Sequence, residues 1–123
     1  LWISNPKVSS RKEMITRLKY MKNDRDFRTE YEYNNWMFLV GGFTSSEAEG
    51  VEWEQLIQDR IFDPLGMKMT TSSIEKAIEI GGGGDNIADC YSVNPLNGQP
   101  RLLPKDVYKV LNLTAPAGSI HST

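Results

Sequence analysis

A polar pair stands directly before the most apolar stretch of this 123-residue chain. Residues 30–43 read EYEYNNWMFLVGGF. Asn35 directly precedes the apolar block Trp36–Val40, and Tyr33 lies two residues before Asn35. An Asn at such a boundary favours a helix start, because its side-chain oxygen accepts from unpaired backbone N–H groups of the first turn. The pair is therefore either a plain helix cap or part of a site that uses the helix as a rigid mount.

The segment behind this pair predicts a helix from about Asn35 to Ser45. Its first residues are apolar on every side, so we expect the helix to be buried all round. Gly41 and Gly42 are small enough to let a neighbouring element approach closely.

Two further helices are predicted to flank this one. Ser10 and Glu13 have the spacing of a capping box, and the apolar residues that follow predict a helix from about Arg11 to Lys22. A third helix is expected from about Val51 to Ile61, and it must end before Pro64, which lacks a backbone N–H.

The second half of the chain predicts shorter elements. Residues 72–80 suggest a short helix, with Ser72 and Glu75 as a second capping box. The run Gly81–Gly84 follows no strand, which argues against a phosphate-binding loop and favours a flexible surface linker. The stretches DCYSV and QPRLL predict a small β-hairpin that turns near Asn97 and Gly98.

Composition and charge exclude several classes of partner. The net charge is −2 and no basic run exceeds two residues, so we expect no nucleic-acid or anionic-membrane binding. The longest apolar run is far too short to span a membrane, and the single Cys90 excludes an internal disulfide. No cofactor or metal is expected. The chain starts on Leu and ends on AGSIHST, which we interpret as an internal piece of a longer protein.

Three stretches together resemble the serine β-lactamase and penicillin-binding-protein superfamily, especially its class C-like esterase and D-aminopeptidase branch. They are YNN before an apolar helix, LIQDRIFDPLGMKMT, and APAGSIHST, in that order. The resemblance covers the chain from about Trp2 to Thr123. It implies an α+β fold, in which residues 1–123 are part of a single β-lactamase-related domain. They would be a fragment of the β-lactamase/DD-peptidase-like fold, mainly its helical lobe, with a small β-hairpin.

The resemblance also implies roles for the polar pair. In this superfamily the Ser of a Ser-x-x-Lys motif, upstream of Tyr-x-Asn, attacks the substrate and forms an acyl-enzyme. A hydroxyl is a weak nucleophile until a base removes its proton, and the Lys and the Tyr of the family handle that proton. By residue match, Tyr33 is the catalytic Tyr, Asn35 is the substrate-binding Asn, and Asn34 fills the variable position.

The chain departs from the family pattern at both ends of the active site. Ser-x-x-Lys strings begin at Ser4, Ser9 and Ser73, and none fits the nucleophile. A proline interrupts the first, the second opens an exposed charged helix too close to Tyr33, and the third follows the Tyr-x-Asn motif. The family's Lys-Thr-Gly or His-Thr-Gly strand is missing, and His121 is interpreted as a turn residue rather than a base.

Two functions of different classes follow from this pattern. The first is a serine hydrolase that acts on an amide or ester of a small molecule or peptide, in which this chain alone would be inactive. The alternative is a non-catalytic binding or structural protein of extracellular-matrix type that keeps the fold. Asn112 begins the sequon Asn-Leu-Thr, a candidate glycosylation site. The family resemblance also favours a secreted or extracytoplasmic location. A Ser-x-x-Lys motif upstream of Tyr33 would favour the hydrolase.

Overall fold

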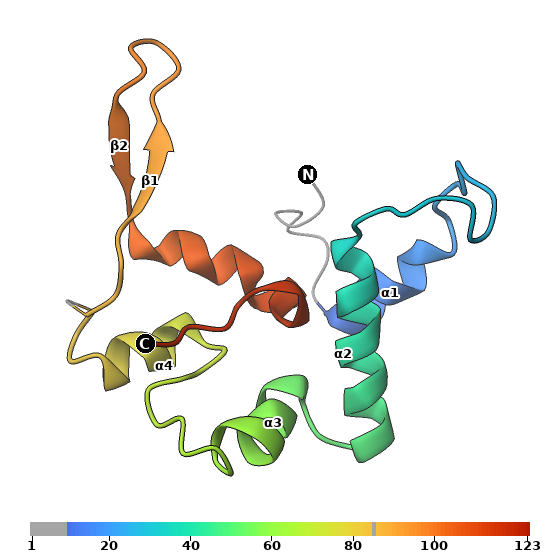
Figure 1. The fold of residues 1–123 in the computed structure, drawn as a ribbon, viewed down its shortest axis with the longest axis horizontal. Coiled ribbons are helices and arrows are strands. Elements are labelled where there is room, and N and C mark those ends of the chain that lie inside the picture. The colour runs from blue at the N-terminus through green and yellow to red at the C-terminus, as the bar shows by residue number, and fades with distance from the viewer. Residues whose placement is uncertain (1–9, 85) are drawn as a thin grey trace.

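A computed structural model describes residues 10–84 and 86–123 of the chain as mainly helical, with a small two-stranded antiparallel sheet (Figure 1). The elements in chain order are α1 (Arg11–Leu18), α2 (Asn35–Glu49), α3 (Trp53–Ile57), the π-helical turn η2 (Gln58–Phe62), α4 (Ile74–Ile80), β1 (Cys90–Val93), β2 (Pro100–Leu103) and the 3₁₀ helix η3 (Lys105–Ala117). The expected mixture of helices with one small hairpin is confirmed.

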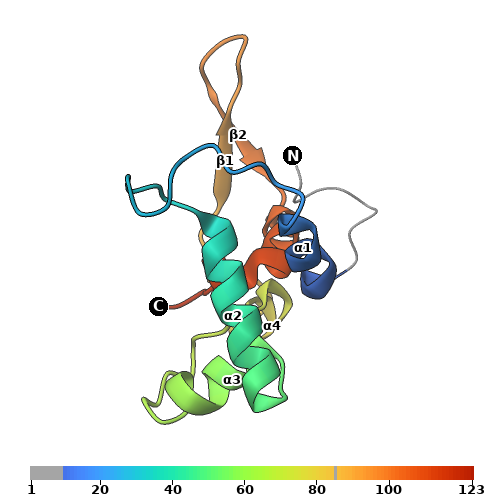
Figure 2. The same ribbon diagram turned by 90° about the vertical axis from the view of Figure 1, so that its right-hand side faces the viewer.

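The longest α-helix, α2, is the element against which the others pack. α1, α3 and η3 all contact it, while α4 packs on η3. The β1–β2 hairpin projects away from the helices in both views (Figures 1 and 2). The core beside α2 is small: Met14 of α1 and Leu39 of α2 are buried, and Leu113 of η3 packs against them.

α1 begins as predicted but is shorter. The Ser10 hydroxyl accepts a hydrogen bond from the Glu13 backbone N–H at 3.2 Å, as half of the expected capping box. The helix ends at Leu18 rather than near Lys22. The apolar residues after Leu18, including Met21, are exposed. Helical turns of this kind gain little without tertiary packing, so the chain leaves the helix there.

α2 departs from the prediction in both length and burial. It continues to Glu49 and ends at Gly50, whose left-handed φ of 71° is the usual helix stop. The expectation that this helix is buried all round is wrong. Leu39 is 0% exposed, but Met37 is 56% and Phe38 51% exposed, so only one side of α2 packs against its neighbours.

The third predicted helix is present, divided into α3 and η2. It starts two residues later than predicted, at Trp53, and its last turn widens to π-helical hydrogen bonding before ending at Phe62. Ile57 and Phe62 are its buried residues. Gly66, with a φ of 68°, then redirects the chain.

α4 is capped one residue later than predicted. Ser73, not Ser72, is the N-cap, and its hydroxyl accepts from the Lys76 backbone N–H at 3.3 Å. Ser72 is buried instead. The predicted capping box was misplaced because three consecutive polar residues, TSS, offer equivalent caps in sequence.

The glycine run is a helix-terminating turn rather than the flexible linker we expected. Gly83 donates its backbone N–H to the carbonyl of Ile78 at 2.9 Å, which closes the end of α4. The Lys105 ammonium group donates to the carbonyls of Gly84 and, at 2.9 Å, of Ile87. The turn is thereby held against the start of η3.

The hairpin is confirmed, whereas η3 was not predicted. Cys90 pairs with Leu103 and Val93 with Pro100, and the turn lies at residues 95–98. η3 has no side-chain cap, contains Pro116 and kinks at Thr114, although it carries two usual helix signals, Asp106 in its first turn and Gly118 after its end.

His121 pairs with a strand-like neighbour instead of occupying a turn, which corrects our interpretation. Its backbone N–H donates to Thr71 at 2.8 Å and its carbonyl accepts from Thr71 at 3.0 Å, forming an isolated antiparallel bridge. The imidazole meets the Tyr108 ring edge-on, with 5.5 Å between ring centroids. The Thr71–His121 bridge and the contact between the two rings together hold the end of the described chain beside α4.

The close approach of η3 to α2 gives a test of the fold. A Cβ added at Gly42 would lie 2.6 Å from Pro116 Cβ and 3.1 Å from Trp53 Cδ1. We expect Gly42→Ala to lower the free energy of unfolding by roughly 1–3 kcal/mol, because the rigid Pro116 ring cannot move aside. Urea denaturation of the purified chain measures this.

The adjacent glycine is the matched control. A Cβ at Gly41 would meet no atom within 4 Å. Gly41→Ala should therefore stabilise the helix by up to about 1 kcal/mol. Equal effects of the two substitutions would contradict the packing of η3 on α2.

Candidate active site

Tyr33, Asn34 and Asn35 at the start of α2 occupy different structural positions. Asn34 is the N-cap, with extended φ and ψ of −141° and 106°, and its Oδ1 accepts from the Trp36 backbone N–H at 2.8 Å. Asn35 is the first helical residue and its side chain is exposed. The sequence left open whether Asn35 caps the helix. The structure shows that Asn34 is the cap, so the Asn35 amide is not used for capping and is available to a ligand.

Tyr33 and Asn35 flank the extended residue Asn34 at the start of α2. Tyr33 is 63% exposed, and its ring lies against the Phe38 ring with 5.9 Å between centroids and 41° between planes. An exposed phenol and an exposed carboxamide thus flank the capping residue at the start of α2.

Ser73 is not brought to this pair. It lies on a different helix, as the cap of α4, and its hydroxyl donates to the Glu75 carboxylate at 2.9 Å. The pKa of Glu75 lies below its ordinary value, because the Glu75 carboxylate accepts hydrogen bonds from the Glu75 backbone N–H and from the Ser73 hydroxyl. Ser4 and Ser9 lie outside the described residues.

The candidate glycosylation site lies on η3. The Asn112 side chain is exposed, while its backbone carbonyl accepts from Arg11 at 2.7 Å. Thr114, the third residue of the sequon, is buried and donates to the Leu111 carbonyl. Glycosylation of Asn112 stays a prediction.

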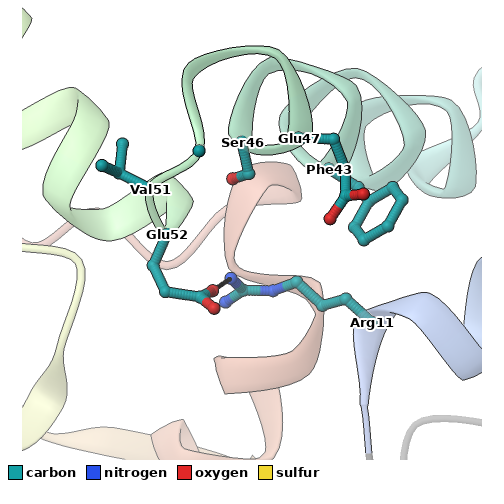
Figure 3. A pocket seen from close by; sticks show the side chains of 7 residues that line it. Arg11, Phe43, Ser46, Glu47, Val51 and Glu52 are labelled. Carbon is teal, nitrogen blue, oxygen red and sulfur yellow. Dashed lines mark ion pairs between the residues drawn. The ribbon is translucent and has the colours of Figure 1, made fainter.

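Two open grooves flank Arg11 near the C-terminal end of α2, whereas Tyr33 lies at its N-terminal end. One has a volume of about 430 Å³ and the other about 480 Å³. Figure 3 shows the first, where Arg11 reaches toward Glu52 below the last turns of α2. Among the charged side chains that line them, Arg11 pairs with Glu52 and Glu54.

Arg11 joins three elements beside these grooves. Its guanidinium forms a two-pronged pair with the Glu54 carboxylate, with 2.9 Å from Nη1 to Oε2. It also donates to the Leu113 carbonyl at 3.2 Å and pairs with Glu52 at 3.7 Å. Partial burial acts to raise the pKa of Glu54. The hydrogen bond from Arg11, the hydrogen bond from the Glu54 backbone and the positive charge of Arg11 outweigh this effect, so the pKa of Glu54 lies below its ordinary value.

Residues 10–84 and 86–123 contain no group of three or more His, Cys, Asp or Glu side chains placed to hold a metal ion. Among the helices of the same residues, none has the length and apolar character needed to cross a bilayer.

Comparison with known proteins gives one family and two relatives. The sequence-family model described as Beta-lactamase matches residues 2–123. Unguisins hydrolase ungD′ of Aspergillus campestris is 29% identical over 86 residues, which are 70% of this chain and 16% of the relative. Unguisins hydrolase ungD of Aspergillus violaceofuscus is 32% identical over 66 residues, 54% of this chain and 12% of the relative.

These relatives are much longer than this chain. The aligned segments span 16% and 12% of the relatives' lengths. No solved structure matches the chain.

Because Asn34 is the cap of α2 and Asn35 is not, replacement of these two residues should affect stability differently. Asn34→Ala should lower the free energy of unfolding by about 1 kcal/mol, because it removes the helix cap. Asn35→Ala should leave stability unchanged or slightly raised, since Ala is the better helix former. Thermal unfolding of both variants measures the difference, and the reverse order would return the cap to Asn35.

The Arg11–Glu54 pair predicts an acid-sensitive part of the stability. The folded pKa of Glu54 lies below its ordinary value of 4.5. The stabilisation is therefore complete above 4.5 and is lost as the pH falls through the folded pKa. Urea midpoints from about pH 7 to about pH 3 should fall less steeply for Glu54→Gln than for the wild type.

Glu52 provides the control for this experiment. It pairs with the same guanidinium, but its side chain is 84% exposed. Glu52→Gln should cost little stability, because exposed ion pairs contribute little. A Glu52 variant as destabilised as Glu54→Gln would contradict the assignment of the acid sensitivity to Glu54.

Proposed function

Since this chain belongs to the Beta-lactamase family, we propose that it is part of a serine hydrolase that cleaves an amide or ester through an acyl-enzyme. The family match and the two relatives named as hydrolases support this reaction class. The observation that carries the proposal is the exposed Tyr33 and Asn35 on either side of the capping Asn34.

Each of the two side chains has a role in the proposed reaction. Tyr33 takes part in moving the proton from the nucleophilic Ser hydroxyl toward the leaving group. Asn35 donates its amide N–H to the carbonyl or amide of the substrate. The Ser oxygen bonds to the carbonyl carbon, the amine or alcohol leaves with the proton, and water then releases the acid from the acyl-enzyme.

The proton role of Tyr33 sets a requirement on its surroundings. A phenol ordinarily titrates near pH 10, so a nearby cation must stabilise its phenolate or pass on the proton. We assign this cation to the Lys of a Ser-x-x-Lys motif elsewhere in the whole protein. In this proposal residues 10–123 supply the helical lobe, and the catalytic Ser and the main sheet come from other segments.

The hydrolase proposal is tested in the full-length protein by removing one hydroxyl. Tyr33→Phe should slow acylation by roughly 10²–10⁴-fold, the usual worth of a positioned acid–base group. Folding should be nearly unchanged, because the side chain is exposed and loses little volume. Stopped-flow and steady-state assays with a p-nitrophenyl ester, a chromogenic cephalosporin and unguisins as candidate substrates measure the rate.

Tyr31 is the matched control. It lies two residues earlier and is 87% exposed. Tyr31→Phe should leave the rate unchanged. A Tyr33→Phe protein with full activity would overturn the catalytic role of Tyr33. A full-length protein without a reactive Ser would favour the non-catalytic binding or structural protein.

A further inference from the structure

The ring contact between Tyr33 and Phe38 has the spacing of a recognised helix-entry motif. With Asn34 as the N-cap, Tyr33 is the residue just before the cap and Phe38 is the fourth helical residue. An apolar contact between these two positions, the hydrophobic staple, fixes the angle at which the chain enters the helix. Here one member of the staple is the candidate catalytic Tyr.

The contact is local rather than part of the core. Both rings are more than half exposed, and the buried side of α2 is formed by other residues, including Leu39. Burial in the core therefore does not hold the Tyr33 ring. The contacts that act on it are the Phe38 ring at 5.9 Å and the backbone turn set by the Asn34 cap.

We propose that Phe38 is a positioning residue that restrains the Tyr33 ring at the start of α2 for the acid–base step. This inference rests on the hydrolase proposal above. An exposed Tyr samples several rotamers, and only one places its hydroxyl for proton transfer. A ring that packs on Phe38 is restricted toward that rotamer, which raises the fraction of productive geometry without contacting substrate.

The expected effect falls on turnover rather than on substrate binding. Aromatic pairs of this kind have a strength that corresponds to a population change of about 3- to 10-fold. In the full-length protein, Phe38→Ala should therefore lower kcat by about 3- to 10-fold, with KM little changed. Phe38→Tyr keeps a ring and should retain nearly full kcat.

Met37 gives a matched control on the same helix turn. It is as exposed as Phe38 and lies one residue earlier, about 100° around the helix axis. Met37→Ala should leave kcat unchanged. If Phe38→Ala lowers the folded fraction, Phe38→Gln, which keeps a good helix former and removes the ring, should show the same loss of kcat in folded protein.

A double-mutant cycle separates positioning from general structural damage. Once Tyr33→Phe has removed the hydroxyl, its position no longer matters, so adding Phe38→Ala should change kcat little. A full additional loss in the double variant, or equal losses from Phe38→Ala and Met37→Ala, would overturn the positioning role. Full activity of Tyr33→Phe would instead overturn the hydrolase role of Tyr33 itself, so the two failures are distinguishable.

Discussion

The Arg11 guanidinium is the contact on which the arrangement of the helices depends. It binds the Glu54 carboxylate through two hydrogen bonds and the carbonyls of Asn112 and Leu113 through two more. Arg suits this position because its planar group offers several fixed donors to a carboxylate and to carbonyls at once. α1, α3 and η3 are thereby joined around one side of α2, although the apolar core there is small. Loss of Arg11 would leave the half-buried Glu54 carboxylate without its partner, whereas loss of Glu54 would leave Arg11 with Glu52 and the two carbonyls.

This clamp makes α2 a rigid mount for its exposed N-terminal end. Leu39 packs on Met14 of α1, and Gly42 lets Pro116 of η3 and Trp53 of α3 approach the helix closely. These contacts lie in the middle of α2. In the first turn Trp36 also packs against this core, whereas Met37 and Phe38 are more than half exposed. A site on a helix that packing holds in place is more precise than one on a loop.

Local rules predicted the elements whose signals are short-range, and they failed where tertiary contacts decide. The hairpin and the starts of α1 and α2 follow from turn and cap residues within a few positions of each other. η3 was missed although Asp106 and Gly118 mark its ends, because Pro116 and the kink at Thr114 interrupt the helical pattern and its packing on α2 is not visible in the sequence. The partial exposure of α2 was missed because the sequence pattern indicated more burial than the neighbouring elements provide. An apolar run indicates burial only when neighbours cover every side, and the described neighbours cover one side.

The candidate site shows the same division between what sequence and structure supply. The types and spacing of Tyr33 and Asn35 were visible in the sequence, but a capping role and a substrate role for Asn35 could not be separated there. The structure gives the cap to Asn34. An Asn side chain that caps a helix uses its oxygen on the backbone, whereas a free Asn can offer its amide to a ligand. A residue such as Val or Leu at position 34 would remove the side-chain acceptor of the Trp36 backbone N–H and weaken the start of α2. In the proposed site, the helix start thus depends on a residue that need not touch the substrate.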